Sequence, residues 1–95
     1  PITNFEFILN IMTDLNTRFE AAVAQSKELS SRPNNATLLK IYALYKQGTQ
    51  GDVQDAKPGF SDMVGRAKWD AWNALKGTAL EQAQQDYIDL IDSLE

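Results

Sequence analysis

The sequence predicts an all-α protein, and three observations support this prediction. No segment shows the sustained alternation of apolar and polar residues that a half-buried strand requires. Apolar residues instead recur every three or four positions in four segments, which is the spacing of one helix face. Prolines, glycines and capping residues separate these segments. The 95 residues fit a single domain with one core.

The first helix is expected to begin near Asp14 or Asn16, because either side chain can accept a hydrogen bond from a free first-turn amide. Pro33 lacks a backbone N–H and is expected to stop this helix. One face of the segment carries Leu15, Phe19, Ala22, Val23, Ser26 and Leu29.

The second helix is expected after Asn34 and Asn35, whose side chains can also accept from first-turn amides. Gly48 and Gly51 are expected to end it. Its apolar residues are Leu38, Leu39, Ile41, Tyr42, Leu44 and Tyr45.

A long connection is expected over residues 51–64, because this stretch has no apolar period and contains the turn signal Pro58-Gly59. Long ordered connections in compact domains are often functional. No carboxylate spacing in the chain resembles a calcium-binding loop or a paired acid and base. We therefore expect turn and capping roles for Asp52, Asp55 and Asp62.

The third helix is expected over roughly residues 65–76, with Asp62 at its entry and Gly77 in the left-handed conformation after it. The fourth is expected to start at Thr78, where Thr78 and Glu81 have the spacing of a capping box. The apolar face of this last helix carries Leu80, Ala83, Tyr87, Leu90, Ile91 and Leu94.

The first eleven residues differ from the rest, because their apolar side chains would lie all round any helix that they form. Met12-Thr13-Asp14 resembles a natural beginning, since capping residues follow the methionine directly. We interpret residues 1–11 as a leader and residues 12–95 as the domain. The alternative is a genuine N-terminal extension that continues the first helix. The apolar residues in question are Phe5, Phe7, Ile8, Leu9 and Ile11.

Composition and charge exclude several classes of function. The chain has no Cys and no His, which excludes disulfide scaffolds, Cys/His zinc sites, thiol nucleophiles and Ser-His-Asp triads. Its net charge of -4 argues against a nucleic-acid-binding protein. It has no apolar run long enough for a membrane span and no signal peptide, so we expect no membrane insertion and a cytoplasmic location.

Two clusters could nevertheless bind a ligand. Tyr42, Tyr45 and Lys46 combine two phenols and an ammonium on the second helix, where Leu38 and Ile41 extend an apolar strip. Such a surface suits a ligand with an apolar part, a flat ring and an anion. The alternative is that both tyrosines are half-buried at a helix interface.

The second cluster lies on the third helix, where Arg66 and Lys68 flank Trp69 and Trp72. Lysine and arginine are the donors that phosphate recognition needs. Two tryptophans in so small a domain are usually core anchors, and we expect at least one of them to be buried.

Four motifs follow one another along the chain: YALYKQGTQGD at residues 42–52, KPG at 57–59, GRAKWDAWNALKG at 65–77 and YI at 87–88. In order and spacing they resemble the acyl-CoA-binding protein family, over about residues 19–94. The resemblance implies a four-helix bundle that binds medium- to long-chain acyl-CoA reversibly, without catalysis, cofactor or metal. We expect a monomeric carrier.

The resemblance also implies roles for individual residues. Tyr45 would stack on adenine, Tyr42 and Lys68 would bind the ribose 3′-phosphate, and Lys46 and Lys27 would add positive charge. Tyr87 would contact the pantetheine or thioester, whereas Leu38, Leu39 and Met63 would line the acyl path. The complete set of implied acyl-CoA-binding residues is Lys27, Leu38, Leu39, Tyr42, Ala43, Leu44, Tyr45, Lys46, Met63, Val64, Lys68 and Tyr87.

Three positions depart from the family pattern. Val64 stands where lysine is frequent, which removes one potential phosphate contact. Gly48 replaces a small residue such as alanine, and Arg66 keeps the charge of the usual lysine with a different geometry. Two other classes of function stay open as alternatives: a helical adaptor that binds a protein helix, and an acyl-CoA hydrolase, for which the sequence offers no plausible base.

Overall fold

The computed structural model describes residues 14–95, and these residues form four helices joined by turns and loops. The helices are α2 (Leu15–Ser26), α3 (Asn35–Gln50), α4 (Met63–Asn73) and α5 (Leu80–Ser93). The described part of the chain contains no strand, which confirms the all-α prediction. None of its helices is long and apolar enough to cross a membrane. The predicted leader, residues 1–11, lies outside the described residues.

Three of the four helices begin at the capping residues that the sequence indicates. The Oδ1 atoms of Asp14 and Asn34 each accept a hydrogen bond from the backbone amide three residues later, at 2.8 Å. Asp62 does the same for Gly65 at 2.9 Å. Each cap satisfies one of the amides that a helix N-terminus leaves without an internal partner.

The predicted capping box at Thr78 is wrong. Helix α5 has Ala79 at its N-cap position and no side-chain cap. Thr78 instead lies in the preceding turn, because its amide donates to the carbonyl of Leu75 and its carbonyl accepts from Gln47 Nε2, at 2.9 Å each. Contacts with a distant helix therefore fix this residue outside α5.

The other helix boundaries differ modestly from those expected. Helix α2 ends at Ser26, well before Pro33, so Leu29 is not part of it. Helix α4 covers Met63–Asn73 rather than residues 65–76. Gly77 has a φ of 89°, which confirms the predicted left-handed conformation at this position.

Gly48 does not end α3, contrary to the sequence prediction, because the helix continues to Gln50. Gly48 is buried where α3 crosses α5, and its carbonyl accepts a hydrogen bond from Gln84 Nε2 at 2.9 Å. A Cβ atom at this position would lie 3.1 Å from Gln84 Cγ and 3.4 Å from Phe19 Cζ. The glycine therefore allows close approach of its neighbours rather than a turn.

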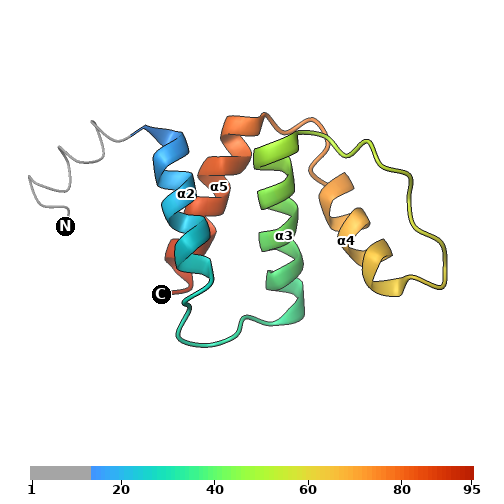
Figure 1. Ribbon diagram of the computed structural model, residues 1–95, viewed down its shortest axis with the longest axis horizontal. Coiled ribbons are helices and arrows are strands. Elements are labelled where there is room, and N and C mark those ends of the chain that lie inside the picture. Colours follow the sequence, from blue (N-terminus) through green and yellow to red (C-terminus); the bar gives the residue numbers. More distant parts are fainter. Residues whose placement is uncertain (1–13) are drawn as a thin grey trace, which may run out of the picture.

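The main core lies between α2, α3 and α5. In Figure 1, α3 stands between the α2–α5 pair on one side and α4 on the other. Among the described helices α4 packs against α3 alone. The side chains buried in this core are Phe19, Ala22, Leu44, Ala83, Tyr87, Ile88 and Ile91.

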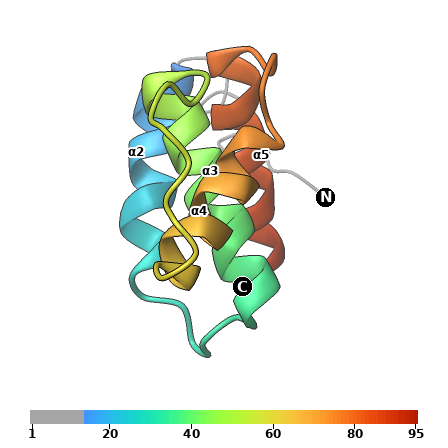
Figure 2. The same ribbon diagram turned by 90° about the vertical axis from the view of Figure 1, so that its right-hand side faces the viewer.

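Two tryptophan side chains of α4 also donate hydrogen bonds to the long connection that starts at Gly51. This connection runs along the outside of α3 and α4 in Figure 2. Trp72 Nε1 donates to the carbonyl of Gly51 at 2.8 Å, and Trp69 Nε1 donates to that of Asp55 at 2.7 Å. Trp72 is 4% exposed, which confirms that one of the two tryptophans is a core residue.

Hydrogen bonds between the buried Gln47 side chain, the exposed Asp52 carboxylate and the Gly77 amide join this connection to the turn before α5. Gln47 Nε2 donates to Asp52 Oδ1 at 2.8 Å, and the same oxygen accepts from the amide of Gly77 at 2.9 Å. These bonds lower the pKa of the Asp52 carboxyl, the Gly77 amide more than Gln47. Asp52 is therefore a turn residue, as the sequence predicted.

Candidate functional site

Two cation–π pairs join α3 to α4 and define their register. Lys68 Nζ lies 4.6 Å from the ring centroid of Tyr42, and Lys46 Nζ lies 5.0 Å from that of Trp72. Each pair joins residues 26 positions apart, so the two helices advance in the same direction, as Figure 1 shows. The two sequence clusters thus meet across one interface.

An apolar groove of about 520 Å³ lies between the N-terminal halves of α3 and α4. It is lined by six of the twelve residues predicted to bind acyl-CoA. It also contains three residues that the sequence prediction missed, Arg32, Asn35 and Ala67. The six predicted residues that line it are Leu38, Leu39, Tyr42, Met63, Val64 and Lys68, the last at the same end as Tyr42.

Helical periodicity could have indicated two of the missed residues. Ala67 follows Met63 by one helical turn, and Asn35 precedes Leu39 by one turn, so each lies on the same face as a predicted residue. Arg32 lies in the connection before α3, where no periodicity applies.

The Tyr42–Lys68 pair also borders a second cavity, of about 320 Å³. Both residues line this cavity and the apolar groove, so the pair separates two neighbouring spaces. Trp69 and Trp72 contribute aromatic surface to the second cavity, whose other lining residues are Asp55, Ala56, Pro58 and Gly65.

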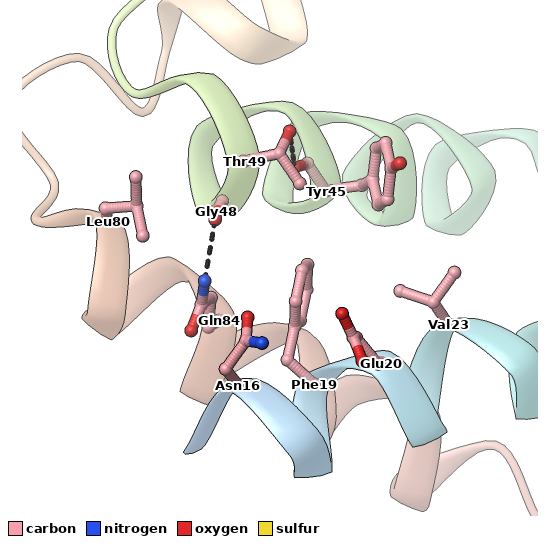
Figure 3. Close-up of a pocket in the computed structure, with 9 residues that line it drawn as sticks. All are labelled: Asn16, Phe19, Glu20, Val23, Tyr45, Gly48, Thr49, Leu80 and Gln84. Atoms are coloured by element: carbon pink, nitrogen blue, oxygen red, sulfur yellow. Dashed lines mark hydrogen bonds between the residues drawn. The ribbon is translucent and has the colours of Figure 1, made fainter. Parts of the chain in front are cut away.

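Tyr45 borders a third cavity, of about 360 Å³, between α2, α3 and α5 (Figure 3). Tyr45 is 39% exposed, and its ring stacks on that of Phe19, with centroids 6.1 Å apart and planes at 26°. Tyr42 therefore lies on the α4 side of α3, whereas Tyr45 lies on the α2 side. The cavity is lined by Asn16, Phe19, Glu20, Val23, Tyr45, Gly48, Thr49, Leu80 and Gln84.

Three of the predicted ligand-binding residues lie in the core. Ala43, Leu44 and Tyr87 are 0%, 2% and 2% exposed. Tyr87 packs edge-on against Phe19, with ring centroids 5.1 Å apart, and burial raises the pKa of its phenol. These three side chains are enclosed in the ligand-free protein, and their contacts with acyl-CoA stay predictions. The centroid of the Tyr87 ring also lies 6.4 Å from that of Tyr45.

The cationic residues of the site have no carboxylate partners in the part of the chain that is described. The ion pair found there joins Lys57 Nζ to Asp70 Oδ1 at 3.0 Å, away from Lys46 and Lys68. Lys27 is exposed at the C-terminal end of α2. Residues 14–95 contain no cluster of carboxylates suited to a metal ion. The arrangement can therefore bind an anion beside an apolar chain.

Comparison with known proteins agrees with this geometry. A family model described as acyl CoA binding protein matches residues 16–91. The acyl-CoA-binding protein homolog of Drosophila melanogaster is 45% identical over 80 residues, which cover 84% of this chain and 93% of that protein. The solved structure of acyl-CoA-binding protein 2 from Oryza sativa superposes with a TM-score of 0.82 at 38% identity, covering 85% of this chain and 90% of that one.

A longer relative matches nearly the whole chain. Enoyl-CoA delta isomerase 2 of Rattus norvegicus is 45% identical over 94 residues, which are 99% of this chain. The chain spans about a quarter of that protein's length, since the match covers 24% of it.

Proposed function

The chain belongs to the acyl-CoA-binding protein family, and we propose that it binds medium- to long-chain acyl-CoA thioesters reversibly, as a carrier and buffer. The observation that carries this proposal is the apolar groove that ends at the Tyr42–Lys68 pair. A hydrocarbon chain and a phosphate are the two chemically distinct parts of acyl-CoA, and the groove offers adjoining surfaces for both.

The groove would hold the acyl chain. Leu38, Leu39 and Met63 provide apolar walls from two different helices. Each methylene that leaves water contributes about 0.8 kcal/mol, so affinity should rise with chain length until the groove is full. Met63 is 78% exposed without ligand and would become covered by the bound chain.

The phosphates would bind at Tyr42, Lys46 and Lys68. A charge-assisted hydrogen bond contributes roughly 1.5–3 kcal/mol, and Lys46 and Lys68 already face the α3–α4 interface. Tyr45 would stack on adenine at the neighbouring cavity, for about 1–3 kcal/mol. Lys27 would add charge from the end of α2.

We also propose that the chain catalyses no reaction on the thioester. It has no His and no Cys, and no carboxylate lines the groove between α3 and α4. A general base must lie within hydrogen-bond reach of the proton that it removes. Palmitoyl-CoA incubated with the protein should therefore lose its thioester no faster than in buffer. A monomeric state and a cytoplasmic location are part of the same proposal and come from the sequence alone.

Calorimetric titration with palmitoyl-CoA, free CoA and palmitate tests the function. We expect tight one-to-one binding of palmitoyl-CoA and much weaker binding of either half alone, because the two parts of the site act together. The alternative of a helical adaptor predicts no heat with any of the three ligands. Such a result would contradict the carrier function.

A further inference from the structure

The far end of the apolar groove is polar and positively charged. The pairing of Tyr42 with Lys68 places these two residues at one end, and α3 and α4 advance in the same direction. Leu38 and Leu39 precede Tyr42 by one turn and line the middle. Asn35 lies one further turn back, and Arg32 precedes the helix, so both lie at the opposite end.

Arg32 has no acceptor in the part of the chain that is described. Its guanidinium makes no hydrogen bond within residues 14–95, and the ion pair found there involves Lys57 and Asp70. No carboxylate lines the groove. Arg32 and Lys68 therefore place one positive charge near each end of an apolar channel.

A plain hydrocarbon chain would use only part of this arrangement. The methyl end of a fatty acyl group gains nothing from a guanidinium, whereas a carboxylate there could form a charge-assisted, bidentate pair with it. The Asn35 carboxamide could donate a further hydrogen bond to the same carboxylate. Tyr42 and Asn35 are seven residues apart, which corresponds to about 10 Å along an α-helix. A medium-length chain can span that distance.

We propose that the groove accepts ω-carboxyacyl-CoA, the CoA thioester of a medium-chain dicarboxylic acid, with the distal carboxylate paired to Arg32. This inference rests on the proposed acyl-CoA binding and names a ligand class for the same site. An unpaired carboxylate is disfavoured beside apolar side chains, so pairing with Arg32 should favour a chain long enough to bring its carboxylate to this end of the groove. A shorter diacid would end between Leu38 and Leu39 and be rejected.

Calorimetry with dodecanoyl-CoA and dodecanedioyl-CoA tests the inference on the wild type, Arg32→Gln and Arg32→Lys. We expect the wild type to bind the two ligands with similar affinity. Arg32→Gln should lower the affinity for dodecanedioyl-CoA by about fivefold, which is the upper range for an exposed ion pair, and leave the affinity for dodecanoyl-CoA unchanged. Arg32→Lys should retain most of the diacid affinity, and added salt should reduce the wild-type affinity for the diacid more than that for the monoacid.

Lys68→Gln is the matched control at the other end of the groove, and it should lower the affinity for both ligands by the same factor. If the wild type binds dodecanoyl-CoA but binds dodecanedioyl-CoA no more tightly than Arg32→Gln does, the inference is wrong and the carrier function stands. If the wild type binds neither ligand, the carrier function itself is wrong. An equal loss of both ligands in Arg32→Gln would assign Arg32 to headgroup binding and also overturn the inference.

Discussion

The two sides of α3 are packed differently. On one side, Leu44 belongs to the main core cluster with Phe19 of α2 and Ile91 of α5. On the other side α4 contacts no described helix except α3, and Met63 and Val64 are largely exposed. The first side contains the main cluster of buried side chains, whereas the second leaves an apolar groove open.

The largest loss of stability is expected when Trp72, which links α4 to the connection after Gly51, is replaced. Trp72→Ala should lower the free energy of unfolding by about 3–5 kcal/mol, because it removes a buried ring and its hydrogen bond to the Gly51 carbonyl. Denaturant unfolding measures this change. Trp69→Ala is the control, since Trp69 is only partly buried and should contribute clearly less. Equal losses in the two variants would contradict the attachment of α4 through Trp72.

Affinity should depend on residues from both sides of α3. Lys68→Ala and Tyr45→Ala should each weaken palmitoyl-CoA binding by roughly 1.5–3 kcal/mol, because one removes a phosphate donor and the other a stacking ring. Calorimetry measures the change, and circular dichroism should show an intact fold. Lys40→Ala is the control, because Lys40 is exposed on α3 and lines none of the three cavities. Wild-type affinity in both test variants would refute the site assignment.

Acid should destabilise the fold where Asp52 accepts hydrogen bonds from Gln47 and from the amide of Gly77. The amide of Gly77, followed by Gln47, lowers the pKa of Asp52 in the folded protein below its ordinary value of 3.8. The folded state therefore favours the carboxylate. The resulting stabilisation is present above pH 3.8 and is lost as the pH falls through the lowered pKa. Urea unfolding at several pH values below 5 should show this loss, and Asp52→Asn should reduce its pH dependence. An unchanged profile in Asp52→Asn would show that other carboxylates, such as Asp14, account for it.

The helix starts were largely predictable from sequence because capping is local. Asp14, Asn34 and Asp62 each bond an amide three residues away, so the pattern and the contact lie in the same short segment. Thr78 and Gly48 were misinterpreted for the opposite reason. Their environments are set by Gln47 and Gln84, which lie 31 and 36 residues away along the chain.

The site residues likewise divide into those that a local motif predicts and those that depend on contacts between distant segments. Tyr42 and Lys68 were predicted from motifs and do line the groove. The motif runs through consecutive residues, however, and a helix turns by about 100° per residue, so Ala43 and Leu44 lie on the core side of α3. Arg32 was missed because only the pairing of α3 with α4 places the connection before α3 at the end of a groove.

The smallest effect on stability and affinity is expected from removing residues 1–11. The core cluster takes its buried side chains from α2, α3 and α5, and the groove takes its walls from α3, α4 and the connection before α3. Deletion of these eleven residues should therefore leave the melting temperature of the ligand-free protein nearly unchanged. An apolar peptide can compete with an acyl chain for the same groove, so the affinity for palmitoyl-CoA should stay equal or increase. Thermal melting at fixed protein concentration, followed by calorimetry, measures both quantities. A large loss of stability would show that this segment is a structural part of the domain.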